Sequence, residues 1–472
     1  MTSDTDLNSS DAPSGRQPPA GRSLAFFNSP AAKLVLIGFV TLMLMVPSTF
    51  VWVLIEERAD RARDVAVDIA KSWGGVQAVN GPYLVVPFSE TRVTGSGNKA
   101  RTEIHQRTAV LFPKKLEVAG DITVEERRKS IYSLPVYKGR FNLKGAFARP
   151  PEAMFEPRHG GTIDVAADKA VLVIGIGDVT ALKSEVVLAL DGVQAIPFEP
   201  GLGLLSRNAS DTVRSLQSSG INAAVPAPKW RNGFSFNIPL QLNGSTAFYV
   251  APAGQTTKVA LQSDWPHPGF TGTFLPETRT ISDTGFEADW TIPYLARGTP
   301  GVQETDQLPL QDKLLGVKFV DPVNFYQTIS RSLKYAIGFI SLTFLAVFVL
   351  EMRTGWRFHW IQYGLVGLAL IIFYVMLLAF AEHAGYGPAY LIAAAAATVL
   401  NAVYVGTSLK SRTAGLTMLL VLAVIFSVLF ALMQEQDYAL LIGSAIAFIS
   451  LAATMFVTQK IDWSGRTVPM TA

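Results

Sequence analysis

The chain has 472 residues, of which 49% are hydrophobic and 16% charged, and its formal net charge at neutral pH is +3. So small and dispersed a charge excludes the basic footprint of a nucleic-acid-binding protein, and we expect no nucleic-acid partner. The sequence contains no cysteine, which excludes disulfides, thiolate zinc sites and cysteine nucleophiles.

The charged residues divide the chain into two parts. Between Glu56 and Lys334, 279 residues carry 60 Asp, Glu, Lys and Arg, a density typical of a soluble domain. Between Tyr335 and Gln459, 125 residues carry only eight, which is too few for a water-soluble fold. We therefore expect an integral membrane protein in which a large water-exposed domain precedes a membrane-embedded C-terminal part.

The N-terminal region combines a polar tail with one apolar run. Residues 1–33 begin with a segment rich in Ser, Asp, Pro and Gly, and they are predicted to form a disordered tail. Residues 34–55 carry no charge and are long enough to cross a bilayer as a helix. Because no small-residue cleavage site follows, we expect a retained signal anchor. Pro47 is expected to kink this helix.

Residues 56–332 form the predicted water-exposed domain. Alternating charges and then Val65, Ile69 and Trp73 at helical spacing predict that the first helix continues out of the membrane. After Gly74-Gly75, short apolar or β-branched runs alternate with Gly, Pro, Asn and Asp. This pattern favours a mainly antiparallel β architecture, either a sandwich or a split barrel, built as one or two subdomains. The predicted strands begin near Tyr83, Arg107, Ile131, Ala170, Glu185 and Phe234.

Three short motifs within this domain have a structural interpretation. Asp191-Gly192 and Asn243-Gly244 are dipeptides typical of hairpin turns. Gly175-Ile-Gly-Asp178 matches a pattern found in intramembrane aspartyl proteases, whose chemistry needs two carboxylates facing each other inside the bilayer. Here the motif is flanked by charged residues in the water-exposed domain. We therefore interpret it as a strand that ends in a turn.

The C-terminal part, residues 333–459, is predicted to be a bundle of five spans, which makes six with the first. A cytoplasmic tail, residues 460–472, would follow. Lys and Arg in the short loops and tails all fall on one side of this arrangement, which places both termini in the cytoplasm and residues 56–332 in the periplasm. The five predicted spans are 335–350, 361–381, 389–409, 415–433 and 438–457.

Few residues in the sequence suggest a catalytic, metal-binding or transport site. None of the five histidines has a second histidine three or four positions on, so we predict no local metal site and no cofactor. Glu382 and His383 end the third span, where either an interfacial position or a functional site is possible. Asn401, deeper in the fourth span, is expected to form an interhelical hydrogen bond. The aromatic, Pro-rich segment around Trp265 and His267 is either a packed loop or a platform for a partner.

Several segments together resemble the CreD family of bacterial inner-membrane proteins. They include Gly81-Pro-Tyr-Leu-Val-Val-Pro, Ser263-Asp-Trp-Pro-His-Pro-Gly-Phe, Glu382-His-Ala-Gly-Tyr and Lys460-Ile-Asp-Trp. The resemblance covers nearly all of the chain after residue 33. It implies a role in cell-envelope integrity and in the envelope-stress and β-lactam response, under a two-component system of the CreB/CreC type. The family offers no established catalytic residues to carry over.

We accordingly expect a non-enzymatic inner-membrane protein whose periplasmic domain binds an envelope component. The expected partners are membrane lipids and either an envelope protein or a peptidoglycan component, and the oligomeric state stays open. One alternative is a transporter or lipid-handling protein that uses Glu382, His383 and Asn401 as a polar path. The other is a periplasmic cell-wall hydrolase, for which the sequence offers no nucleophile and base.

Overall fold

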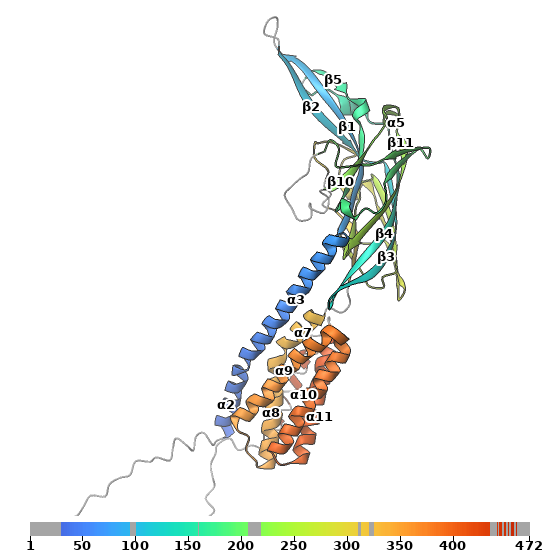
Figure 1. Ribbon diagram of the computed structural model, residues 1–472. Coiled ribbons are helices and arrows are strands. Elements are labelled where there is room, and N and C mark those ends of the chain that lie inside the picture. The colour runs from blue at the N-terminus through green and yellow to red at the C-terminus, as the bar shows by residue number, and fades with distance from the viewer. Residues whose placement is uncertain are drawn as a thin grey trace, which may run out of the picture. The chain divides into compact units, whose positions relative to one another are not determined.

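The computed structural model describes residues 30–94, 101–158, 160–205, 219–309, 313–320 and 325–434, with scattered residues between 441 and 459. The chain forms two compact units (Figure 1). The helical unit comprises Met1–Ala59 and Asn324–Ala472, and the β unit comprises Asp60–Val323.

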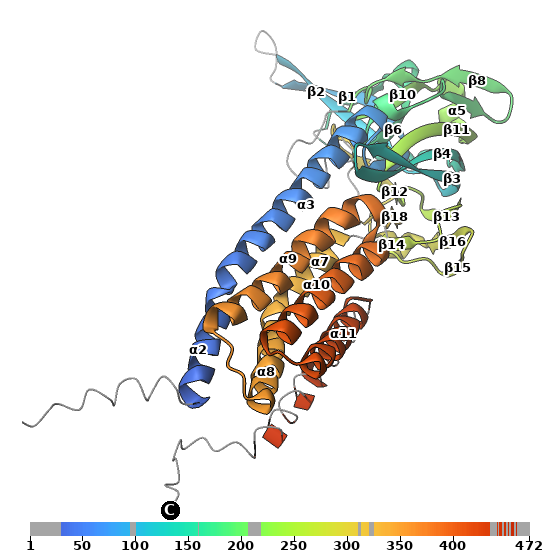
Figure 2. The same ribbon diagram turned by 60° about the horizontal axis from the view of Figure 1, so that its bottom comes forward.

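The helical unit contains the expected membrane-spanning helices. Among the described residues, five helical stretches are long and apolar enough to cross a membrane, and the first of them runs from Ala32 to Trp73. The next four coincide with the predicted spans to within about one turn, and Figure 2 shows them side by side. The predicted span 438–457 lies largely outside the described residues. The helices are α2 (Pro30–Met43), α3 (Met45–Trp73), α7 (Phe325–Lys334), α8 (Ala336–Thr354), α9 (Trp360–Ala384), α10 (Tyr386–Ser408) and α11 (Arg412–Gln434).

The first spanning stretch is interrupted where Pro47 predicted it. Pro47 has no N–H to donate to the carbonyl of Met43, and α2 ends at Met43 while α3 begins at Met45. Backbone hydrogen bonds from Leu44 to Val40 and from Ser48 to Leu44 connect the two helices across this interruption. The continuation of the helix beyond residue 55 is confirmed, because α3 extends to Trp73.

The β unit contains two large sheets and is mixed rather than purely antiparallel. Most neighbouring strands are antiparallel, but β1 pairs with β12, and β13 with β3, in parallel. The first sheet has the order β14 (Pro268–Gly272), β18 (Leu315–Phe319), β12 (Ala247–Ala251), β1 (Gln77–Thr94), β6 (Val171–Ile176), β10 (Ser219–Ala224) and β9 (Glu199–Pro200), with β2 (Arg101–Leu111) and β5 (Thr162–Val165) on β1 and β17 (Val302–Glu304) on β2. The second sheet has the order β15 (Thr278–Ser282), β16 (Gly285–Ile292), β13 (Thr256–Ser263), β3 (Lys115–Lys129), β4 (Tyr132–Phe147), β11 (Phe234–Ser245), β7 (Val187–Leu190) and β8 (Gln194–Pro197).

The two sheets share one hydrophobic core, which makes the β unit a sandwich. Along β11 every second side chain from Phe234 to Leu242 is buried, as a strand with one face on a core requires. Aromatic contacts join the sheets: Phe141 of β4 stacks on Phe248 of β12 with ring centroids 4.1 Å apart. Phe270 of β14 likewise contacts Trp290 of β16. Because the buried residues of both sheets form one cluster, the β unit has a single core.

The three short motifs have different outcomes. Asp191 and Gly192, with φ of 49° and 74°, form the turn between β7 and β8, as predicted. The prediction for Asn243-Gly244 is wrong, because both residues lie inside β11 and pair with β4. A Cβ at Gly244 would collide with the ring of Tyr137, so this glycine makes room for an aromatic ring. Gly175-Ile-Gly-Asp178 is the end of β6 followed by a turn that Asp178 caps, as expected.

Candidate functional site

The structure separates Glu382 and His383, which the sequence had suggested as a pair. The Glu382 side chain is only 8% exposed, and one of its oxygens lies 3.9 Å from a guanidinium nitrogen of Arg58 in α3. The other oxygen accepts a hydrogen bond of 3.2 Å from the hydroxyl of Tyr326 in α7. His383 is exposed, and its Nδ1 lies 3.1 Å from the carbonyl oxygen of Ala379 in its own helix. The two side chains therefore do not form one site.

A second buried carboxylate, which sequence reasoning missed, lies at the C-terminal end of α8. Glu351 is 5% exposed and forms an ion pair with Lys33 of α2. Its second oxygen accepts a 3.0 Å hydrogen bond from Tyr363 of α9. Lys33 also donates to the carbonyl oxygen of Phe358 at 2.8 Å. The predicted span stopped at Leu350, whereas α8 extends to Thr354, so Glu351 lay outside the predicted span.

Asn401 is buried, as its position in the fourth span suggested, but its predicted partner is wrong. The side chain is 1% exposed, and its amide donates a 3.0 Å hydrogen bond to the carbonyl oxygen of Ala397. Both residues belong to α10, so this bond is intrahelical. A short amide side chain reaches the carbonyl one turn back without needing a neighbouring helix.

The segment around Trp265 and His267 lies at the start of β14. The Trp265 indole packs on the core and donates a 3.1 Å hydrogen bond to the carbonyl oxygen of Val320. His267 is exposed, and its ring meets the Trp265 ring edge to face. Much of the segment is therefore used in packing, and the exposed His267 is the part that a partner could reach.

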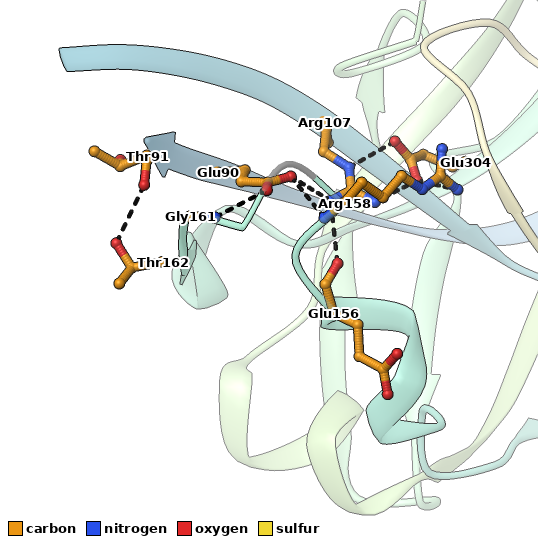
Figure 3. Close-up of polar contacts among 8 residues, drawn as sticks. All are labelled: Glu90, Thr91, Arg107, Glu156, Arg158, Gly161, Thr162 and Glu304. Atoms are coloured by element: carbon orange, nitrogen blue, oxygen red, sulfur yellow. Dashed lines mark hydrogen bonds and ion pairs between the residues drawn. The ribbon is translucent and has the colours of Figure 1, made fainter. Parts of the chain in front are cut away.

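The β unit contains a polar network that joins β1, β2 and β17 of the first sheet to the segment around Arg158 (Figure 3). Glu90 of β1 is fully buried and accepts hydrogen bonds from Nη1 of Arg107 and the backbone N–H of Arg158, each at 3.1 Å. Arg107 of β2 is 7% exposed and also forms a bidentate pair with Glu304 of β17, at 2.7 and 2.8 Å. The Arg158 side chain contacts Glu304 at 2.9 Å.

Within this network the charges neutralise one another. The hydrogen bond from Arg107 is the largest influence on Glu304 and holds the pKa of that carboxyl below its ordinary value. The same bond raises the pKa of Arg107 above its ordinary value, although burial acts in the opposite direction. Two carboxylates thus face two guanidinium groups. Such an arrangement ties strands together, and the lowered pKa of Glu304 keeps that carboxyl group ionised near neutral pH.

A second buried cation in the β unit is held by carbonyl oxygens. Arg297 is 2% exposed and donates to the carbonyls of Ala253 at 2.7 Å and Thr299 at 2.6 Å. Its guanidinium carbon lies 4.4 Å from the centre of the Phe112 ring. Burial is the main influence on this group and lowers its pKa from the ordinary value. Arg297 fixes the loop that follows α6 (Tyr294–Arg297).

A polar hollow of about 380 Å³ lies beside β13, β15 and β16 of the second sheet. Hydroxyl, amide and carboxylate side chains line it, which suits a polar ligand rather than an apolar one. Among the described residues, no group of three or more His, Asp or Glu side chains is placed to hold a metal ion. The side chains that line the hollow include Asp121, Gln262, Asp264, Thr280, Ser282 and Glu287.

Comparison with known proteins identifies the family. Residues 29–464 match the family model described as Inner membrane protein CreD. The chain is 33% identical over 435 residues to the Inner membrane protein CreD of Escherichia coli strain K12, which covers 91% of this chain and 92% of that protein. A solved M1 zinc metallopeptidase of Deinococcus radiodurans aligns over 76% of this chain and 95% of its own, but with 10% identity and a TM-score of 0.21, so no activity is inferred from it. The chain therefore belongs to the CreD family of multi-pass inner membrane proteins.

Proposed function

We propose that this protein supports the integrity of the cell envelope and its response to β-lactam stress. Its β unit would do so by binding an envelope component without catalysis. In this proposal both termini are cytoplasmic, the β unit is periplasmic, and a sixth span lies at residues 438–457. Membership of the CreD family and the one-sided distribution of loop Lys and Arg support this arrangement.

The proposal of a non-catalytic role rests on the network of Glu90, Arg107, Arg158 and Glu304 in the β unit, whose charges neutralise one another. An acid or base catalyst needs a carboxyl group that can exchange its proton near the working pH. Glu90 and Glu304 instead each face Arg107, and the pKa of Glu304 is lowered. This arrangement stabilises the fold and does not supply an acid or base catalyst.

The polar hollow beside β13 and β16 is the place in the β unit where we expect such a component to bind. Its hydroxyl, amide and carboxylate groups match the hydroxyl, amide and amino groups of a peptidoglycan fragment. A photo-crosslinking amino acid at Gln262, which is exposed in this hollow, tests the proposal in intact cells. The matched control carries it at Val193, which is 92% exposed in the turn between β7 and β8.

We expect crosslinks to peptidoglycan or to an envelope protein from position 262 and none from position 193. In the full-length protein, E287Q should weaken the crosslink, because Glu287 lines the same hollow and is exposed. Equal labelling from both positions, or none from position 262, would remove the recognition part of the proposal.

The alternative of a transporter is favoured by one observation, the two buried carboxylates Glu351 and Glu382 in the helical unit. It can be tested by complementing a deletion strain under β-lactam and detergent stress. E382Q and H383A are compared separately, with membrane abundance measured for each. Full resistance with E382Q would favour the scaffold, whereas failure at normal abundance, together with proton-dependent flux in vesicles, would favour transport.

A further inference from the structure

The first spanning stretch consists of α2 and α3 and is called the first helix below. It presents two cations on the face that contacts the other helices of the helical unit. Lys33 pairs with Glu351, near the end of α8, and Arg58 lies beside Glu382, near the end of α9. Twenty-five residues separate the two cations, which is close to seven helical turns and about 37 Å along the axis. At this spacing, side chains return to the same face of a helix.

The residues between the two cations confirm that this is a single packed face. Val40, Leu44, Val51 and Ile55 are between 1% and 8% exposed and recur at spacings of four and seven residues. On the opposite face, Leu42 is 62% exposed, as expected for a lipid-facing side chain. The packing against α9 is close, because a Cβ at Gly367 would collide with Leu44.

Each cation is held by the same combination of groups. A buried glutamate faces it, and a tyrosine hydroxyl donates to the other oxygen of that glutamate: Tyr363 at Glu351 and Tyr326 at Glu382. The glutamate side chains are 6% and 8% exposed. Removing one partner from such a pair leaves a buried charge uncompensated, so each pair strongly disfavours any displacement that separates it.

We propose that these two pairs, Lys33–Glu351 and Arg58–Glu382, form a registration device that fixes the axial position of the first helix. A displacement of one turn, about 5.4 Å, separates both pairs at once. The helix therefore has discrete docked positions rather than a continuous range. Beyond Arg58, α3 itself continues to Trp73. This inference does not depend on the proposed function.

Cysteine crosslinking in native membranes tests this device, because the chain has no cysteine of its own. A Cβ at Gly364 would lie 4.0 Å from Cγ1 of Val40, so V40C/G364C reports the observed position. L36C/G364C and L44C/G364C report displacement by one turn in either direction. Each pair is introduced into the full-length protein and into the E351Q/E382Q variant, with M352Q/H383A as the control at neighbouring exposed positions.

In the otherwise native background we expect V40C/G364C to crosslink fastest. In E351Q/E382Q its rate should fall at least about fivefold while one of the displaced pairs gains, and M352Q/H383A should behave as the native chain. Exchange of one pair in K33E/E351K should keep the native pattern, since the attraction is retained. Unchanged rates in E351Q/E382Q would overturn the proposal. So would loss of all three crosslinks, which means undocking, or a displaced pattern in K33E/E351K.

Discussion

Removal of the Arg107 side chain should destabilise the β unit more than the loss of a surface ion pair would. In R107A the buried Glu90 carboxylate loses the guanidinium that donates to it at 3.1 Å, while the backbone N–H groups of Arg158, at 3.1 Å, and Gly161, at 3.4 Å, still donate to it. Breaking a buried pair by removing one partner costs about 3–5 kcal/mol, because the remaining charge is uncompensated. For a unit of this size that corresponds to a melting temperature lower by roughly 6–20 °C.

Thermal unfolding of the detergent-solubilised full chain measures this effect. Trp230 and Trp290 are 2% and 1% exposed in the β unit, so their fluorescence reports its unfolding. The matched control is R149A, because the Arg149–Glu152 pair is 69% and 90% exposed and should contribute about 0–1 kcal/mol. The double variant E90Q/R107A should recover part of the loss, since it no longer buries a carboxylate that has lost its guanidinium partner.

Two results would refute this reasoning. If R107A melted at the same temperature as R149A, the Glu90 carboxylate would not depend on its guanidinium partner. If E90Q/R107A were no more stable than R107A, the cost would come from lost packing of the Arg107 side chain over Phe88, whose ring centre lies 4.7 Å from the guanidinium carbon, rather than from the charge left on Glu90.

Three further predictions follow from the same structure. The ion pair of Glu304 should stabilise the β unit fully above pH 4.5, the ordinary pKa of its carboxyl group, and should lose this contribution as the pH falls through the lower pKa of the folded state. When the pH is lowered from 5 to 3, the melting temperature of E304Q should therefore fall by less than that of the native chain. G244A should lower the free energy of unfolding by about 1–3 kcal/mol, because its methyl group enters the space of the Tyr137 ring. The control is G75A, which has open space around its Cβ. Equal stability of the two variants in urea unfolding would contradict the packing argument. W265A should lower the free energy of unfolding by up to about 3 kcal/mol, because packing and the hydrogen bond to Val320 are lost. H267A should stay within about 0.5 kcal/mol of the native chain. The reverse order in the same assay would contradict the conclusion that Trp265 packs on the core while His267 is exposed.

The sequence by itself determined the elements that have a local physical cause. An apolar run of about 20 residues has to satisfy its backbone groups internally, so the spans that became α8 to α11 could be located to within about one turn. Alternation with period two likewise located β11. Asp191-Gly192 was recognisable because two consecutive positive φ angles favour those residues. Asn243-Gly244 carries a similar signal but lies within β11, where the Tyr137 ring of the neighbouring strand takes the space that a side chain at position 244 would fill.

The tertiary structure alone decided which charges meet. Glu382 could be singled out from its position at the end of a span, but nothing local indicates that Arg58 faces it while His383 does not. Lys33 and Glu351 are 318 positions apart, and Glu304 is 197 positions from Arg107. The free energy that keeps a buried charge in place comes from partners on other elements, and those partners are fixed by packing between helices and sheets rather than by neighbours along the chain.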